Sequence, residues 1–175
     1  MVYMTQEVVP VSLGGTMTDN DFQQLLQRFY QLQAERVETY RLFDEGHLAY
    51  LKSGPHYDFI RYRQLVHEIT QAFNGISKEL IQMKDRFREL HDRPDLSEHL
   101  EKIQELEKEK LELTARLQLA KQNAQDHPND EAHQEEVHLV KHKWISKRTR
   151  MLKMSDISLK ENAHLAPILK AMQKN

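Results

Sequence analysis

The sequence predicts an all-α protein, an elongated antiparallel hairpin or bundle of about four long helices with coiled-coil character. Apolar residues recur every three or four positions through most of the chain, which is the period of an amphipathic helix. Charged residues make up 30% of the 175 positions and hydrophobic residues 39%, so the core has to be narrow. Only five glycines and five prolines interrupt the pattern. Long helices lying side by side satisfy all three observations.

A helical hairpin is predicted over residues 18–92, after an aperiodic N-terminal arm at 1–17. The first helix starts at Thr18, where Asp21 completes a start signal of capping-box type, and it ends before Gly54 and Pro55. Arg36 falls on its apolar face, where a charge has to reach water or find a carboxylate. The other residues predicted on this face are Phe22, Leu25, Leu26, Phe29, Leu32, Val37, Tyr40 and Phe43.

The second helix of the hairpin is predicted to begin after Asp58, which can cap it, and to run to Leu90. Its seam has steps of three or four residues throughout, so Gly75 is interpreted as a weak or closely packed point inside one helix rather than as a turn. The seam consists of Phe59, Tyr62, Val66, Ile69, Phe73, Ile76, Leu80, Met83, Phe87 and Leu90.

Two further helices are predicted within residues 93–153. Pro94 suits the start of the third helix, and Asp95 with Glu98 can form a capping box. A turn at residues 127–130 precedes the fourth helix, which is basic. Its periodic signal fades after Met154, so residues 154–175 are expected to be a C-terminal tail, with one more short helix from Leu159 to Leu169, broken at Pro167, as the alternative.

Composition restricts the classes of function. The chain contains no cysteine, which rules out disulfides and thiolate zinc sites. No signal peptide or apolar run long enough to cross a membrane is evident, so a soluble protein of the nucleus, the cytoplasm or both is expected. No glycine-rich phosphate loop or catalytic motif is present. We therefore expect no catalytic residues, no cofactor and no small-molecule substrate.

A metal site is the main alternative suggested by the ten histidines. His138 and His142 have the i, i+4 spacing that places two imidazoles on one helical face. A third ligand is not evident beyond Glu135, and such pairs on a polar helix are usually surface residues. His67 and Glu68 begin a zinc-protease motif, but Gln71 stands where its second histidine is required. We therefore expect no metal site.

The predicted fourth helix carries the best candidate contact surface. It has six cations and no acid between Val137 and Met154, whereas acids dominate the segment before it. This polarity suits the helix dipole, but cations on both sides of the helix exceed what the dipole needs. A contact with nucleic acid or an acidic partner is the functional alternative. The candidate residues are Lys141, Lys143, Trp144, Lys147, Arg148 and Arg150, and positions 147–150 also match a short nuclear-import pattern.

Residues from Phe29 to about Leu80 resemble the "required for excision 1-B" domain family of small eukaryotic helical proteins. The residues that carry the resemblance are Leu32, Gln33, Arg36, Tyr40, Arg41, Glu45, Gly46, Tyr50, Leu51, Ser53, Gly54, Tyr62 through Phe73, Ile76 and Ser77. The resemblance implies a part in excision repair of DNA damage as a non-catalytic accessory factor. No family active site can be transferred to this sequence.

The sequence thus leads to an accessory or scaffold protein of DNA excision repair. It would bind other proteins through its helical seams, and nucleic acid through the fourth helix. The alternative is a structural coiled-coil subunit of a cytoskeletal or ciliary assembly, whose seams would pack on partner helices. An enzyme or metalloprotein is the third hypothesis.

Overall fold

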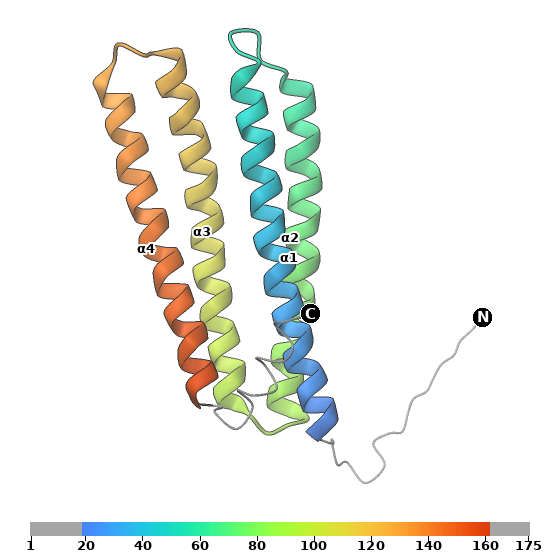
Figure 1. Cartoon of the computed structure of the whole chain (residues 1–175). Helices are drawn as coiled ribbons and strands as arrows, with labels where there is room; N and C mark the ends of the chain where they lie inside the picture. Colours follow the sequence, from blue (N-terminus) through green and yellow to red (C-terminus); the bar gives the residue numbers. More distant parts are fainter. Residues whose placement is uncertain (1–18, 162–175) are drawn as a thin grey trace, which may run out of the picture.

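The computed structural model describes residues 19–161, with side chains over 20–154, and these residues form four antiparallel helices (Figure 1). The helices are α1 (Asp19–Lys52), α2 (Phe59–Glu89), α3 (Pro94–Asp126) and α4 (Glu131–Glu161). Residues 19–161 contain no strand. The all-α class and the long antiparallel helices predicted from the sequence are confirmed.

Two hairpins lie side by side, α1 with α2 and α3 with α4 (Figure 1). Helix α3 joins them, because it packs on α2 and, less extensively, on α1, while α4 packs mainly on α3. The turn between α2 and α3 lies at one end of the bundle, and the α1–α2 and α3–α4 turns lie at the other. We call the latter the open end.

The apolar core is concentrated in the half of the bundle next to the α2–α3 turn. The core lies there because apolar seam residues from all four helices meet in this half of the bundle. The buried members are Leu25, Phe29, Leu32, Ile76, Leu80, Met83, Phe87, Leu96, Leu100, Ile103, Leu106 and Met151. A smaller cluster of Tyr40, Phe43, Ile69 and Phe73 lies nearer the open end. The seams predicted for a coiled coil are therefore occupied largely within one chain.

Several predicted helix boundaries are confirmed. The Asp58 side chain caps α2 by accepting a hydrogen bond from the Arg61 backbone N–H at 3.3 Å. Helix α2 continues through Gly75, where an added Cβ would meet no atom within 4 Å. Gly75 is therefore a weak point of the helix and not a site of close packing. Thr18, the N-terminal arm and residues 162–175 lie outside the described residues.

The predicted capping box at Asp95 is wrong. Pro94 occupies the first turn of α3, which places the N-cap at Arg93 and moves Asp95 into the first turn. There Asp95 forms an ion pair with Arg93, with 2.8 Å between the nearest nitrogen and oxygen. Helix α4 also continues to Glu161, so the boundary expected after residue 153 falls inside it.

Three residues predicted on core faces point to solvent instead, and one of them is Leu90, the C-cap residue of α2, which is 49% exposed. Val37 is 68% exposed, although Arg36 before it is buried. Phe59 is 59% exposed at the first position of α2. Packing against α1 is provided one turn later by Tyr62, whose ring stacks on Tyr50.

None of the helices in the described range combines the length and the apolar composition that a membrane span requires.

Candidate functional site

The exposed cations of α4 lie on two sides of the helix, Lys141 with Arg148 and Lys143 with Arg150. Lys141, Lys143 and Arg150 are exposed. Arg148 is exposed too, and its guanidinium carbon lies 5.7 Å from the centre of the Trp144 ring. These four side chains can approach a phosphate or a carboxylate of another molecule.

The other two candidate residues of α4 are engaged within the fold. The Lys147 ammonium forms an ion pair with Glu109 of α3. Trp144 is half-buried and donates its indole N–H to the Thr114 hydroxyl at 2.9 Å. Helical geometry at 100° per residue predicts Lys147 on the outer side of α4 and Arg148 within the apolar stripe, and the structure reverses this order. The predicted stripe residues Val140 and Met151 do face the bundle, and Lys147, seven residues after Val140 and four before Met151, lies between them.

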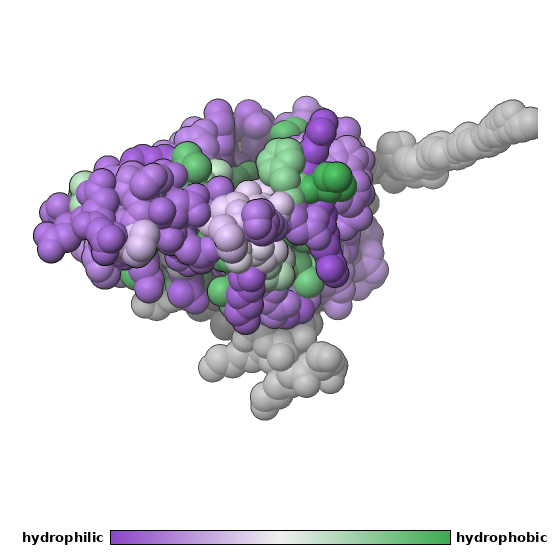
Figure 2. Space-filling model, turned by 90° about the horizontal axis from the view of Figure 1, so that it is seen from above, coloured by the Kyte–Doolittle hydropathy of each residue, from purple (hydrophilic) through white to green (hydrophobic). Residues whose placement is uncertain are grey.

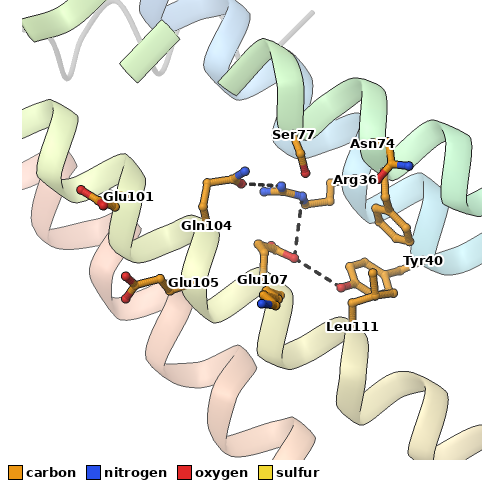
Figure 3. Close-up of a pocket in the computed structure, with 11 residues that line it drawn as sticks. Arg36, Tyr40, Asn74, Ser77, Glu101, Gln104, Glu105, Glu107 and Leu111 are labelled. Atoms are coloured by element: carbon orange, nitrogen blue, oxygen red, sulfur yellow. Dashed lines mark hydrogen bonds and ion pairs between the residues drawn. The ribbon is translucent and has the colours of Figure 1, made fainter. Parts of the chain in front are cut away.

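A buried polar network lies where α1 meets α3, just beyond the main apolar core (Figure 3). Arg36 Nε and Glu107 Oε2 are 3.8 Å apart, so Arg36 has the carboxylate that its place on an apolar face required. Arg36 also donates to Gln104 at 2.5 Å, and the Tyr40 hydroxyl donates to Glu107 at 3.4 Å. Burial lowers the pKa of Arg36, although Glu107 opposes this, and burial together with Glu107 raises the pKa of Tyr40.

Lys110 connects this network to α4. Its ammonium lies 4.0 Å from the centre of the Tyr40 ring and 5.6 Å from that of Trp144. Burial lowers the pKa of Lys110, partly offset by the charge of Glu107. The two aromatic faces attract this cation and stabilise it between the hairpins.

A pocket of about 440 Å³ opens beside the network, between α2 and α3 over α1 (Figure 3). Apolar groups of Tyr40, Phe73 and Leu111 contribute to its lining, and Glu101 and Glu105 are exposed carboxylates of α3 at the same pocket. The remaining lining residues are Arg36, Asn74, Ser77, Gln104, Glu107 and Lys108. Arg36 is committed to Glu107, so the pocket suits an apolar or cationic group better than an anion.

Aromatic side chains hold the open end of the α1–α2 hairpin. The Tyr50 ring stacks on Tyr62 with 4.4 Å between centroids and lies 4.8 Å from the ring of Tyr57. His47 is buried against Tyr50 and Tyr62, and burial lowers its pKa to about 4. From α3, the Gln125 amide donates to the Leu51 carbonyl at 2.7 Å.

This end carries an apolar pair that the sequence prediction missed. Phe59 and Ile60 are 59% and 83% exposed. In Figure 2, which looks down on the open end, hydrophobic side chains are visible on this end of the molecule. The seam prediction placed Phe59 in the core and left Ile60 without a role. Two adjacent large apolar residues at a helix start were the available signal, since neighbours in a helix cannot both face one core.

The described residues hold no group of three His, Asp or Glu side chains arranged to bind a metal ion. His138 and His142, the spaced pair in the sequence, are both exposed on α4.

Four long antiparallel helices with a polar network at their centre define an elongated helical-bundle protein. The family model described as DNA repair REX1-B matches residues 24–121, which is more than half of the chain. The chain belongs to this REX1-B family. The matched span begins in α1 and ends in α3, so the basic helix α4 lies outside it.

Two curated relatives are both called "Required for excision 1-B domain-containing protein". The one from Bos taurus is 44% identical over 101 residues, which cover 58% of this chain and 56% of the relative. The one from Mus musculus is 43% identical over 95 residues, covering 54% of this chain and 56% of the relative. The match thus spans little more than half the length of these relatives. No solved structure matches the chain.

Proposed function

We propose that this protein is a non-catalytic accessory or scaffold factor in DNA excision repair. The observation that carries the proposal is membership in a family named for DNA repair, on a match from residue 24 to residue 121. The relatives carry the same association in their names, "Required for excision 1-B". A role in repair makes nucleic acid, or proteins already bound to it, the natural partners of the exposed surfaces.

Protein binding through the helices is supported by apolar side chains left at the surface. Val37 and Leu42 of α1, Leu119 of α3 and Leu139 of α4 are all exposed. The pocket between α2 and α3 adds an apolar hollow beside exposed carboxylates. A structural coiled-coil subunit has weaker support, because most of the seams that it needs for partner helices are already buried within this chain.

The exposed cations of α4 are the proposed contact for nucleic acid or an acidic partner. Lys141, Lys143 and Arg150 are exposed, and Arg148 is exposed while its guanidinium lies over the Trp144 ring of the same helix, so all four can approach phosphates. Binding through such cations weakens as salt is added, because counterions released from DNA drive it.

The contact is tested by binding of the purified protein to labelled duplex and single-stranded DNA over a salt series. Changing Lys141, Lys143 and Arg150 to Gln should weaken binding and flatten the salt dependence. The matched control changes three exposed cations elsewhere, Lys78, Arg88 and Lys102, to Gln. Equal weakening in both variants would assign the effect to net charge instead of α4.

Absence of DNA binding near physiological salt would leave a scaffold that contacts only proteins. Self-association of the purified chain that depends on its exposed apolar residues would favour the structural-subunit alternative. The proposed role as a whole is tested by the rate at which lesions are excised when the protein is absent.

A further inference from the structure

The start of α2, next to the turn from α1, exposes two large apolar side chains. Ile60 is 83% exposed, more than any other large apolar residue in the described part, and Phe59 beside it is 59% exposed. A single exposed apolar residue is ordinary, but an adjacent pair at the tip of a hairpin needs an explanation. We call residues 52–63, which carry this pair, the hairpin tip.

The hairpin tip is held in place from several directions. Tyr62 stacks on Tyr50 across the hairpin. The Asp58 backbone N–H donates to the Ser53 hydroxyl at 3.0 Å, and Gln125 of α3 fixes the Leu51 carbonyl. These contacts fix the first turn of α2, so Phe59 and Ile60 project from a rigid support.

Three exposed cations belong to the same hairpin tip as the apolar pair. Lys52, Arg61 and Arg63 are exposed, and no ion pair joins them to a carboxylate within residues 20–154. Arg63 follows Phe59 by four residues and Ile60 by three, which places it next to each of them one turn further along α2.

Two acids, Asp58 within the hairpin tip and Asp126 in contact with it, each accept a hydrogen bond from the tip. Asp58 caps α2 through the Arg61 backbone N–H, and Asp126 accepts a hydrogen bond from the Tyr57 hydroxyl. The hairpin tip is therefore an apolar pair flanked by available positive charge.

We propose that the hairpin tip binds nucleic acid where bases are unpaired or unstacked. Phe59 stacks on an exposed base and Ile60 fills the space of a disrupted base step, while Lys52, Arg61 and Arg63 contact the flanking phosphates. Aromatic stacking on bases and apolar wedges between base steps are both established modes of recognition. A distorted site is preferred because its bases are already partly unstacked.

This inference rests on the proposed function, since damaged DNA is where excision repair acts. The hairpin tip lies inside the span that matches the family, residues 24–121, whereas α4 lies outside it. A membrane surface is the competing partner for an apolar and basic tip. Two side chains offer little area for insertion, and stable membrane anchoring generally takes more than one signal.

The test compares binding of the full chain to two labelled DNAs, a fully paired duplex and the same duplex with a central unpaired bubble. The wild type should bind the bubble roughly tenfold more tightly, as expected from stacking of one base. Changing Phe59 and Ile60 to Ala should abolish this preference. The control changes Leu48 and Leu119, exposed by 53% and 60%, to Ala and should keep it.

A second variant separates the charges from the apolar pair. Changing Arg61 and Arg63 to Gln should weaken binding to both DNAs and reduce its salt dependence. Quenching of a fluorescent base analogue placed in the bubble reports stacking directly, and it should be lost in Phe59→Ala and retained in Phe59→Tyr.

Equal affinity of the wild type for the two DNAs would overturn the proposal, as would a bubble preference that survives the loss of Phe59 and Ile60. Binding to vesicles of phosphatidylserine and phosphatidylcholine that needs Phe59 and Ile60, without a bubble preference, would assign the tip to membranes. Slow lesion excision in cells lacking the protein, combined with equal binding of the two DNAs, would overturn the proposal for the hairpin tip and leave the proposed function standing. Normal excision in cells lacking the protein would overturn only the proposed function.

Discussion

The Arg36 guanidinium of α1 and the Glu107 carboxylate of α3 face each other inside the bundle, with 3.8 Å between Nε and Oε2. Both side chains are almost fully buried, at 5% and 6% exposure. The pair links the two hairpins just beyond the apolar core, so it couples the position of α3 to that of α1. Removing one member leaves the other charge buried without compensation, which costs more than the pair itself contributes.

Glu107→Leu should therefore reduce the free energy of unfolding by about 3–5 kcal/mol. The double variant Arg36→Leu with Glu107→Leu should be less destabilised than Glu107→Leu alone, because the Arg36 charge is no longer left buried without its partner, while Lys110 loses the neighbouring charge of Glu107 in both variants. Urea unfolding of the purified variants gives both values. Additive losses in the double variant would show that the two charges do not interact.

Two glycines in helices should respond in opposite directions to alanine. A Cβ at Gly46 would lie 2.0 Å from Leu65 Cδ2, so Leu65 has to move and we expect a net loss of about 1 kcal/mol, less if its rotamer adapts. A Cβ at Gly75 meets open space, so Gly75→Ala should gain about 1 kcal/mol from helix propensity. The melting temperatures of Gly46→Ala, Gly75→Ala and the wild type, measured by thermal unfolding, compare the two effects. Leu65→Ala in the Gly46→Ala background should reduce the penalty of the added methyl group, and an unchanged penalty would argue against the clash.

Stability should fall as the pH drops from about 6.5 toward 4, because of His47. Its ordinary pKa is 6.5, and burial lowers the pKa in the folded protein to about 4. Between these values the unfolded chain binds a proton that the folded chain does not, which favours unfolding by up to about 3 kcal/mol at the acidic limit. Burial also lowers the pKa of His91, which acts in the same direction.

The comparison that isolates His47 is urea unfolding at pH 7.5 and pH 5 for the wild type and for His47→Gln. The variant should lose a smaller part of its stability on acidification. If both proteins lose the same amount, other groups are responsible for the pH dependence.

Trp144→Phe should destabilise the protein by about 1 kcal/mol, because the Thr114 hydroxyl loses the indole donor while ring packing is largely kept. Ile145→Ala, at a neighbouring position with 47% exposure, should stay within about 0.5 kcal/mol of the wild type. Denaturant unfolding measures both. A larger effect at Ile145 would mean that the outer face of α4 contacts something in the folded protein.

The helices could be predicted because their boundaries are local. Asp58 caps α2 through a neighbouring backbone N–H, and the seam of α2 keeps its period through Gly75. The candidate surface depends on which side chains at the two edges of the apolar stripe of α4 find a partner on α3, and a helical wheel does not fix this. For that reason Lys147 was predicted outside but is paired with Glu109, and Arg148 was predicted inside but is exposed.

The polar centre could be predicted only in part. The place of Arg36 on an apolar face required a carboxylate or water, but Glu107 lies in another helix, 71 residues along the chain. The tip pair was missed for a related reason. Periodicity assigns Phe59 to the seam, whereas its exposure follows from where α2 begins relative to the packing of Tyr62 on Tyr50.

The central claim is a non-catalytic part in excision repair, and it is tested most directly by the excision of ultraviolet photoproducts in extracts depleted of this protein. Depletion should slow release of the damaged oligonucleotide, and the purified wild-type protein should restore it. The Phe59→Ala, Ile60→Ala variant and the Lys141, Lys143, Arg150 variant should restore it less well. Excision at the normal rate after complete depletion would contradict a role in this repair reaction.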